Sequence, residues 1–146
     1  MAVDDQVRAA LGNAYDYAES IVRADGHYLG ELKSNCTITA EYILLYQALG
    51  SDDVLSRNAP ALQQYLLSEQ NPDGSWSIAP GQPGNISTTV ESYLALKLLG
   101  LSPDKSPALR QAQSWVTTVG GGVENVRVFT RMYLAQVRIR KRHPTY

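Results

Sequence analysis

The residues of this sequence that could serve as acids in catalysis are two adjacent aspartate pairs and two isolated glutamates, Asp4-Asp5, Asp52-Asp53, Glu41 and Glu91. A carboxylic acid protonates a substrate only when its neighbours keep it protonated and poised, so grouped carboxylates are the arrangement that matters. Glu41 and Glu91 occupy equivalent positions of two similar segments and could face a cavity as an acid pair. Charges at helix starts and hydrogen bonds between repeats are the interpretation that we favour.

The sequence gives little support for a metal site, a reactive thiol or a phosphate-binding loop. His27 and His143 have no cluster of metal-ligating residues beside them, and the single Cys36 excludes an internal disulfide framework and a Cys-based zinc site. Cys36 precedes an expected helix, where a thiolate could be favoured, but a small buried side chain is the simpler interpretation. Residues 71–74 supply one aspartate where a calcium loop needs several, and residues 120–122 lack the Gly-Lys-Ser/Thr of a phosphate loop. We therefore predict no catalytic residue, metal site or cofactor site.

Length and composition describe an ordinary domain. The chain has 146 residues, 44% of them hydrophobic, and a formal net charge of −1. The near-neutral balance gives no electrostatic reason to expect a nucleic acid as a partner. The N-terminus is polar and acidic, unlike a secretory signal, and no apolar run approaches the roughly 20 residues of a membrane span. These features predict a cytoplasmic protein.

Helical periodicity dominates the sequence and predicts six helices, at about residues 4–22, 37–49, 59–70, 87–99, 104–119 and from 124 into the tail. Pro60 is expected in the first turn of the third helix, where its missing N–H does no harm. Thr88 and Glu91 have the spacing of a capping box for the fourth helix. Gly50 and Gly100 are plausible stops for the second and fourth helices.

Apolar stripes on these helices predict which faces are buried. In the second helix the stripe at three- and four-residue spacings contains Ile38, Tyr42, Leu45, Tyr46 and Leu49. The first helix has a similar stripe, made by Val7, Leu11, Ala14, Ala18 and Ile21. Tyr42, Tyr46 and Tyr93 lie at core spacing, so we interpret them as packing residues rather than as the walls of a cavity.

The helices belong to a repeat. Gly26, Gly74 and Gly122 are spaced at 48 residues, since 74 − 26 and 122 − 74 both equal 48. SNCTITAEYILLYQALG parallels GNISTTVESYLALKLLG at an offset of 50, and VFTRMYLAQV is a weaker third copy. Repeats of this length with two helices each are typical of helical arrays and toroids. We predict an all-α fold of three antiparallel helical hairpins that form an incomplete α/α barrel.

The stretch QNPDGSW joins two of these helices. Asp73-Gly74 makes a turn, and glycine supplies a backbone conformation that a side chain would resist. The Gln70 amide can satisfy a helix-end carbonyl or reach a backbone group of the next repeat. Trp76 offers a large flat face for packing. We therefore interpret Tyr65, Gln70, Gly74 and Trp76 as a structural staple between repeats.

Tyr65-Leu66-x3-Gln70-x3-Gly74-x-Trp76 resembles the QW repeat of triterpene cyclases. YLLSEQNPDGSW, TTVESYLALKLLGLS and GGVENVRVFTRMYLA also resemble the N-terminal part of squalene-hopene cyclases, in that order. The resemblance covers nearly the whole chain, and we assign residues 1–137 to it and residues 138–146 to a divergent basic tail. The first copy of the QW pattern is degenerate, with Val22 at its Gln position and Tyr28 at its Trp position.

The resemblance implies a class II terpene cyclase, an isomerase that protonates a squalene-type polyprenoid and cyclises it in an apolar cavity. The family takes its proton from an Asp-x-Asp-Asp motif in a polypeptide several times longer. Neither aspartate pair here has an aspartate two positions before it, so we expect a truncated chain that is inactive alone. A membrane or lipid-droplet surface would suit such a substrate, and the basic tail could contact one, although a solvated helix end explains the tail as well.

Two other hypotheses stay open. The chain could be one half of a split cyclase whose other half is a second chain. It could also be a non-enzymatic helical-repeat module that binds a lipid or a protein. Apolar helix faces left uncovered by missing repeats would favour self-association or a partner in each case.

Overall fold

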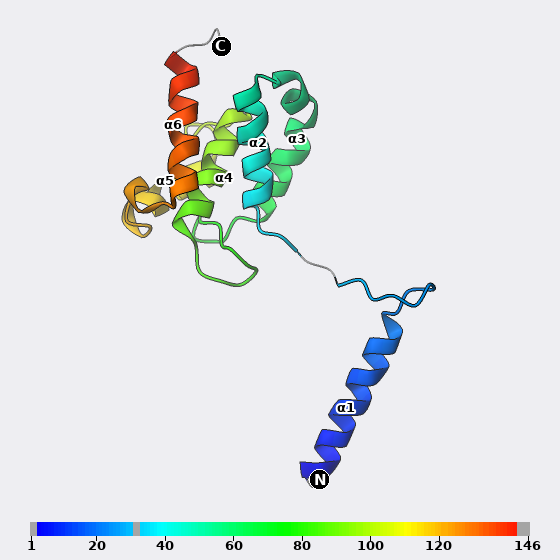
Figure 1. Cartoon of the computed structure of the whole chain (residues 1–146). Helices are drawn as coiled ribbons and strands as arrows, with labels where there is room; N and C mark the ends of the chain where they lie inside the picture. The colour runs from blue at the N-terminus through cyan, green and yellow to red at the C-terminus, as the bar shows by residue number, and fades with distance from the viewer. Residues whose placement is uncertain (1–2, 31–32, 143–146) are drawn as a thin grey trace. The chain divides into compact units, whose positions relative to one another are not determined.

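The computed structural model describes residues 3–30 and 33–142, with side chains up to Arg138, and it consists of helices and loops (Figure 1). The helices are α1 (Val3–Ser20), α2 (Thr37–Leu49), α3 (Asp52–Ser68), α4 (Ile86–Leu98), α5 (Pro107–Thr118), the short 3-10 helix η1 (Val123–Asn125) and α6 (Val128–Arg142). The predicted all-α class is confirmed. His143 and most of the predicted basic tail lie outside the residues whose side chains are described.

The chain divides into two compact units, Met1–Lys33 and Ser34–Tyr146. The first unit contains α1 and a turn at Gly26, where Val22 and Tyr28 form an isolated antiparallel bridge. No residue of α1 is buried, so its apolar stripe has no cover within this unit.

In the second unit α4 is the central helix. It contacts α2, α3, α5, η1 and α6, and α2 also contacts α3 and α6. The second helices of the three repeats, α2, α4 and α6, thus lie together, and α3 and α5 pack outside them (Figure 1). This is the arrangement of an α/α-toroid fold, in which each repeat packs mainly on the next.

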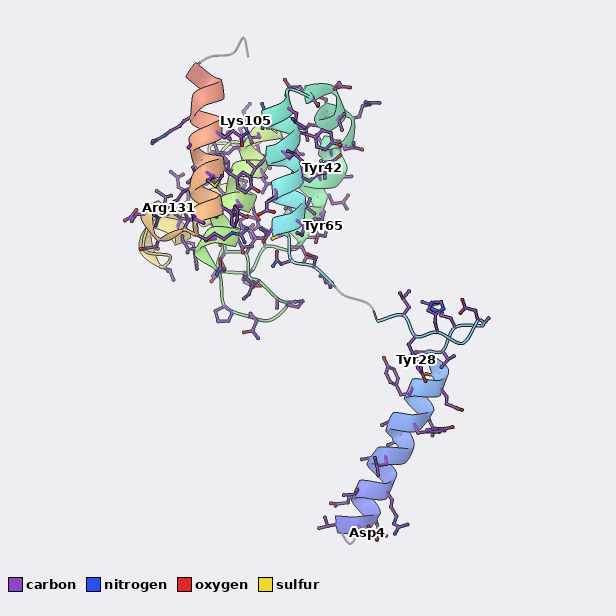
Figure 2. All side chains as sticks on the ribbon, viewed as in Figure 1. Asp4, Tyr28, Tyr42, Tyr65, Lys105 and Arg131 are labelled. Carbon is purple, nitrogen blue, oxygen red and sulfur yellow. The ribbon has the colours of Figure 1, made fainter. Side chains whose placement is uncertain are left out.

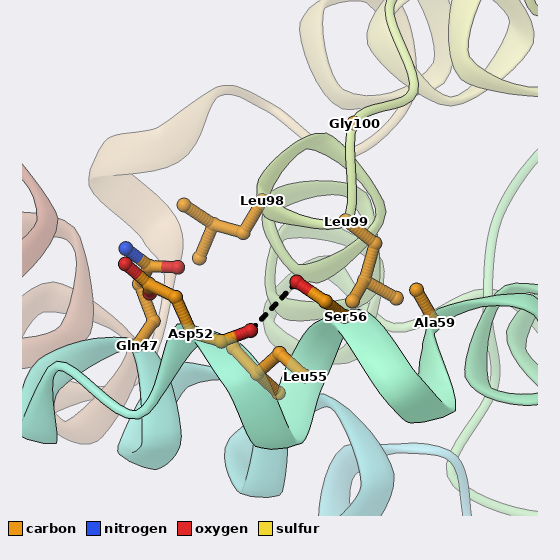
Figure 3. Close-up of a pocket in the computed structure, with 8 residues that line it drawn as sticks. All are labelled: Gln47, Asp52, Leu55, Ser56, Ala59, Leu98, Leu99 and Gly100. Atoms are coloured by element: carbon orange, nitrogen blue, oxygen red, sulfur yellow. Dashed lines mark hydrogen bonds between the residues drawn. The ribbon is translucent and has the colours of Figure 1, made fainter.

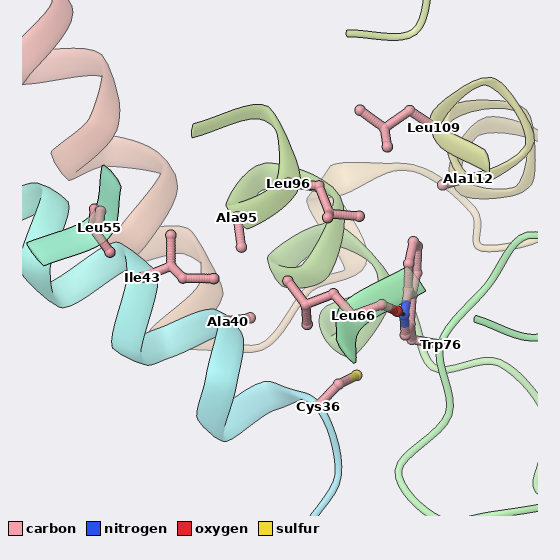
Figure 4. Packing of buried hydrophobic residues seen from close by; sticks show 10 residues of the cluster. All are labelled: Cys36, Ala40, Ile43, Leu55, Leu66, Trp76, Ala95, Leu96, Leu109 and Ala112. Carbon is pink, nitrogen blue, oxygen red and sulfur yellow. Dashed lines mark hydrogen bonds between the residues drawn. The ribbon is translucent and has the colours of Figure 1, made fainter. Parts of the chain in front are cut away.

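The core of this unit forms around α4 (Figure 4). Its main cluster of buried residues contains Cys36, Ala40, Ile43, Leu55, Leu66, Trp76, Ala95, Leu96, Leu109 and Ala112. Tyr46 and Tyr93 pack against the cluster, as the sequence predicted. Every helix from α2 to α5, and the loop before α4, supplies at least one member, so the cluster joins the repeats.

Backbone hydrogen bonds confirm the repeat. Asn71 N–H donates to the Ser75 carbonyl oxygen at 2.8 Å, and Arg23 N–H donates to the His27 carbonyl oxygen, 48 residues earlier, at 2.9 Å. Likewise, Leu101 N–H donates to the Leu96 carbonyl oxygen at 3.1 Å, and the pair 50 residues earlier makes the same bond at 3.0 Å. The first two copies therefore share their turns as well as their helices.

The predicted start of the third helix was wrong. α3 begins at Asp52 and passes through Pro60, which lies inside the helix rather than in its first turn. The extra turns bring Leu55 into the core, where it is buried. Burial of an apolar side chain contributes about 1.5–3 kcal/mol, which offsets much of the roughly 3 kcal/mol cost of an internal proline.

The predicted capping box was also wrong. The N-cap of α4 is Asn85, whose side-chain oxygen accepts hydrogen bonds from the N–H groups of Ser87 and Thr88 at 3.0 and 3.1 Å. Glu91 lies well inside the helix and is fully buried. α5 begins at Pro107 after the N-cap Ser106, somewhat later than predicted. Gly50 and Gly100 follow α2 and α4 with positive φ, as expected of residues that end helices.

Most of the stripe predicted on α2 faces outward, although its member Tyr46 packs against the core cluster. Ile38, Tyr42, Leu45 and Leu49 are exposed, so the packing role predicted for Tyr42 was wrong, whereas Ala40, Ile43 and Leu44 are buried. Ala40 and Ile43 belong to the core cluster that residues of α3 and α4 also form. α2 is apolar on nearly all sides, so its periodicity could not identify the face that packs. The positions of α3 and α4 decide it instead.

Candidate functional site

The loop between α3 and α4 connects two repeats through Gln70. The Gln70 side-chain amide donates to the Gly74 carbonyl oxygen at 2.8 Å and to the Ala108 carbonyl oxygen, in the first turn of α5, at 2.9 Å. One amide thus holds its own loop and the next repeat together, which is one of the two contacts considered from the sequence.

Trp76 lies at the centre of the same loop and is fully buried. Its indole N–H donates to the Leu66 carbonyl oxygen near the end of α3 at 2.7 Å. Its backbone N–H donates to the Thr89 hydroxyl in α4 at 3.0 Å. Trp76 therefore connects the end of α3 with the start of α4 and fills the core between them (Figure 4).

Tyr65, the remaining member of the predicted staple, packs against the same core cluster from α3 (Figure 2). It precedes Leu66, whose carbonyl oxygen accepts the Trp76 indole bond. Tyr65 thus packs beside the loop that Gln70 and Trp76 connect to the neighbouring helices.

Gly74 has φ +89 and lies against α5. A Cβ atom at this position would stand 2.6 Å from Cβ of Gln111 and 2.7 Å from its backbone carbonyl carbon. Glycine is therefore required both for the conformation and for the close approach of the two repeats.

Gly74→Ala is expected to lower the free energy of unfolding by about 3 kcal/mol, because strain and overlap add. Gly100→Ala is the matched control, since Gly100 has φ +96 and open space around the added Cβ. It should cost only the strain, about 1 kcal/mol. Urea unfolding followed by circular dichroism measures both. Equal losses would contradict a requirement for close approach to α5.

Asp73 and Trp115 belong to this site, and the sequence reasoning missed their contact. The Asp73 carboxylate accepts bonds from the Ser75 hydroxyl at 2.6 Å, from Ser75 N–H at 3.0 Å and from the Trp115 indole N–H at 3.0 Å. The Ser75 hydroxyl bond is the main reason why the pKa of Asp73 lies below its usual value, and the Trp115 bond contributes. The sequence order Asp73-Gly74-Ser75 is typical of an Asx turn, so the bonds from Ser75 to Asp73 could have been predicted from it.

The lowered pKa of Asp73 predicts a pH dependence. A carboxyl group whose pKa is depressed by folding stabilises the protein above its unfolded pKa, about 3.9, and loses that contribution as the pH falls through the folded value. The difference in urea midpoint between wild type and Asp73→Asn should therefore be largest near neutral pH and shrink below about pH 4. A difference that stays constant down to acidic pH would contradict the assignment.

A second candidate site is an ion cluster between α2, α4 and the segment before α6. Arg127 Nη2 donates to Glu41 Oε1 at 2.7 Å and to Glu91 Oε2 at 2.9 Å, and Arg127 Nε donates to Glu91 Oε1 at 3.1 Å. The Thr130 hydroxyl also donates to Glu91 Oε1. Hydrogen bonds between repeats thus explain Glu41 and Glu91, as the favoured interpretation predicted.

Glu91 is fully buried, and burial raises its pKa, although Thr130 and Arg127 act in the opposite direction. A buried carboxylate is costly unless it is paired and hydrogen-bonded, and here both of its oxygens have donors. This arrangement holds three helices of successive repeats together. The missed signal was a cation, Arg127, just before the third copy of the repeat, where it can pair with the glutamates of the first two copies.

The other candidate acids lie elsewhere, and Asp4 forms an exposed ion pair with Arg8 on α1 at 3.2 Å. Asp53 forms an exposed ion pair with Arg57 at 3.1 Å. Asp52 lines a pocket of about 370 Å³ between α2, the start of α3 and the end of α4 (Figure 3). Its lining residues are Gln47, Asp52, Leu55, Ser56, Ala59, Leu98, Leu99 and Gly100. This pocket holds a single carboxyl group, so it offers no acid pair.

Metal and thiol chemistry remain unsupported in the described part of the chain. No group of three or more His, Cys, Asp or Glu residues within residues 3–30 and 33–142 could hold a metal ion. Cys36 is buried, and desolvation raises the pKa of its thiol, so a thiolate is disfavoured. Among these residues no helix is both long and apolar enough to span a membrane.

Comparison with known proteins gives consistent matches. The family description of the squalene-hopene cyclase N-terminal domain matches residues 11–143. The chain is 44% identical over 130 residues to a squalene–hopene cyclase of Alicyclobacillus acidocaldarius, covering 87% of this chain and 20% of that protein. It is 42% identical over 138 residues to a squalene hopane cyclase of Aspergillus fumigatus, covering 92% of this chain and 18% of that protein.

A terpene cyclase–glycosyl transferase fusion protein of Humicola fuscoatra is 45% identical over 129 residues, which cover 86% of this chain and 10% of the fusion protein. The chain thus spans a tenth to a fifth of the length of these relatives. The similarity concerns their N-terminal domain architecture and leaves most of each relative without a counterpart in the 146 residues.

Proposed function

The chain belongs to the squalene-hopene cyclase N-terminal domain family, and on this premise we propose that it forms the N-terminal part of a terpene cyclase acting on a squalene-type polyprenoid. The observation that carries the proposal is the family match over residues 11–143, together with relatives named as squalene cyclases at 42–44% identity. The role of these residues would be to build part of the helical scaffold around the substrate.

The proton for cyclisation would come from outside these 146 residues. Protonation of an alkene needs a carboxylic acid that is protonated and free to donate. Glu91 has donors on both oxygens, Glu41 is bound to Arg127, and Asp53 is exposed to solvent. No Asp-x-Asp-Asp sequence occurs in the chain. An acid-bearing segment, in a longer polypeptide or in a second chain, would complete the catalytic site.

Within this scaffold, Tyr65, Gln70, Gly74 and Trp76 would act as the staple between the second and third repeats. The bonds of Gln70 to Ala108 and of Trp76 to Leu66 support this role, as does the close approach of Gly74 to Gln111. Carbocation chemistry needs a rigid cavity that excludes water, and a staple of this kind would contribute rigidity without contacting the substrate.

The location of the protein would follow from the substrate. Squalene-type polyprenoids are apolar, so the enzyme would meet them at the cytoplasmic surface of a membrane or lipid droplet. Phe129 and Met132 on α6 are exposed apolar side chains that could contribute to such contact. Co-flotation of the purified chain with vesicles would support the location, and its absence at low salt would argue against it.

An assay with squalene tests the catalytic proposal. The purified 146-residue chain should form no cyclic triterpene from squalene or oxidosqualene at any pH, because it lacks a suitable acid. Product formed only after addition of the remainder of a related cyclase would identify a split enzyme. If the chain and the remainder of a related cyclase both fold and bind each other but form no cyclic product, the result would favour the non-enzymatic module. Cyclic product from the chain alone, above a boiled control, would contradict the proposal.

A further inference from the structure

Trp115 packs with the two residues that directly precede the partners of the buried ion pair. It belongs to a cluster of buried apolar side chains that also contains Val90 and Val126. Val90 directly precedes Glu91 on α4, and Val126 directly precedes Arg127. One apolar cluster therefore fixes the backbone beside both members of the ion pair, and Trp115 is the largest of its buried members.

The indole ring of Trp115 is held between two loops. Its N–H donates to the Asp73 carboxylate at 3.0 Å. A Cβ atom at Gly84 would stand 2.7 Å from Cζ2 of the indole, and a Cβ atom at Gly120 would stand 2.8 Å from Cζ3. The α3–α4 loop and the loop after α5 thus both approach the ring closely, so it has little room to shift.

The chain segment between Trp115 and Arg127 is anchored at both ends. The N–H of Gly120 donates to the Trp115 carbonyl oxygen at 2.9 Å. The N–H of Arg127 donates to Oγ of Ser87 on α4 at 2.9 Å, and η1 lies in the segment between the two bonds. The end of α5 and the start of α4 therefore set together where the backbone of Arg127 lies.

The position of this backbone decides whether the ion cluster forms. Nη2 and Nε of Arg127 donate to the two oxygens of Glu91 at 2.9 and 3.1 Å. The Arg127 side chain is 46% exposed, so its own burial does not hold it in one conformation. A long, half-exposed side chain keeps several bonds only when its starting point is fixed, because each alternative rotamer competes with them.

We propose that Trp115 positions the Arg127 guanidinium on Glu91, by fixing the backbone that directly precedes each of the two residues. Asp73 and the two close glycines hold the indole itself, so the loop between α3 and α4 is connected to the ion cluster through one ring. The inference goes beyond the proposed function, which gives Trp115 no role, and it holds whether or not the chain contributes to catalysis.

The ionisation of Glu91 reports on the position of Arg127. Burial raises the pKa of Glu91 and Glu41 adds to the rise, whereas Thr130 and Arg127 oppose it. Tyr133 of α6 interacts electrostatically with the same groups, and burial raises its pKa, so it stays neutral over the range in which a carboxyl group titrates. A guanidinium that moves away from Glu91 must therefore raise the pKa of this carboxyl group.

Carbon-13 NMR of the side-chain carboxyl groups tests the proposal, with Glu91→Gln used to assign the Glu91 signal. In Trp115→Leu the Glu91 titration should shift to higher pH than in wild type, because leucine fills less of the cluster and leaves Arg127 less firmly placed. Circular dichroism establishes that the variant is folded over the range of the titration. An unchanged Glu91 titration in folded Trp115→Leu would overturn the proposal.

Leu109→Ala is the matched control for a purely structural role of Trp115. Leu109 is also on α5 and is fully buried, but it belongs to the main core cluster and not to that of Trp115. Its loss should lower the urea midpoint and leave the Glu91 titration where it is in wild type. An equal shift of the Glu91 titration in Leu109→Ala and Trp115→Leu would show that general loosening moves Glu91, and would contradict the proposal.

Gly120→Ala perturbs the ring and leaves Trp115 in place, so it tests the proposal even if Trp115→Leu does not fold. Gly120 has no positive φ, so the added methyl acts through its overlap with Cζ3 of the indole and with Cδ1 of Ile86, the end of a flexible side chain. The Glu91 titration should shift to higher pH in Gly120→Ala. The added methyl should cause a smaller shift in a Trp115→Leu background, where leucine leaves room for it. No shift in Gly120→Ala, or an equal shift in both backgrounds, would overturn the proposal.

Discussion

Replacement of Arg127 by alanine is expected to lower the free energy of unfolding by about 3 kcal/mol. Arg127 holds Glu91 and Glu41 through three hydrogen bonds, and the Glu91 side chain is fully buried. Removing one partner of a buried ion pair leaves the other charge without compensation, at a cost of about 3–5 kcal/mol. The lower end applies because the Arg127 side chain is itself 46% exposed.

The deficit of Arg127→Ala should depend on pH. Burial already raises the pKa of Glu91, and Arg127 acts against that rise. A carboxyl group with a raised folded pKa favours the folded state below its unfolded pKa, about 4.3, and this contribution is lost as the pH rises through the folded value. The deficit should therefore be largest near neutral pH and smaller near pH 4, where protonated Glu91 needs no cation.

Arg57→Ala is the control for this prediction. Arg57 and Asp53 form a pair at 3.1 Å on the exposed surface of α3, with both side chains more than 70% exposed. Loss of this ion pair should lower the free energy of unfolding by less than about 1 kcal/mol. Urea unfolding of the three proteins between pH 4 and 8 gives the comparison. A deficit for Arg127→Ala that equals that of Arg57→Ala, or does not change with pH, would show that Glu91 does not depend on Arg127.

Trp76→Ala is expected to cost about 3–5 kcal/mol, the range for truncating a buried aromatic side chain. Trp76 fills the main core cluster and is fully buried, and its indole N–H satisfies the Leu66 carbonyl oxygen. The substitution would remove the packing and leave that carbonyl without its partner. Trp76→Phe should recover only part of the loss, because a phenyl ring restores part of the buried volume and neither the remainder nor the hydrogen bond to Leu66.

Trp115→Ala should cost less than Trp76→Ala. Trp115 bonds to Asp73 and belongs to a smaller cluster with Val90, Val116 and Val126. Its partner is an exposed carboxylate that water can solvate. Circular dichroism during urea unfolding compares the two variants, and equal midpoints would contradict the ranking.

The fold class could be predicted because the sequence carries two strong local signals, helical periodicity and turn glycines at a constant spacing. Gly26 and Gly74 both have positive φ and share the same turn hydrogen bonds. Local signals failed where a tertiary contact decided the outcome. α3 extends through Pro60 because Leu55 reaches the core, and α2 packs through Ala40 and Ile43 because α3 and α4 lie on that side.

The same distinction between local signals and tertiary contacts applies to the candidate site. The turn at Gly74 and the reach of Gln70 to another repeat were predictable, since both depend on residue type and on chain direction. The bonds of Asp73 to Trp115 and of Arg127 to Glu91 were not, because they join residues 42 and 36 positions apart. Their partners depend on how the repeats stack, and a single sequence does not contain that geometry.

The central claim, that this chain is a working N-terminal part of a terpene cyclase, is tested most directly by a chimera. Residues 11–143 would replace the matching segment of the Alicyclobacillus acidocaldarius squalene–hopene cyclase, and gas chromatography with mass spectrometry would follow squalene conversion. The account predicts cyclic triterpene from the chimera and none from the 146 residues alone. A chimera that unfolds as cooperatively as its parent yet forms no cyclic product would contradict the claim.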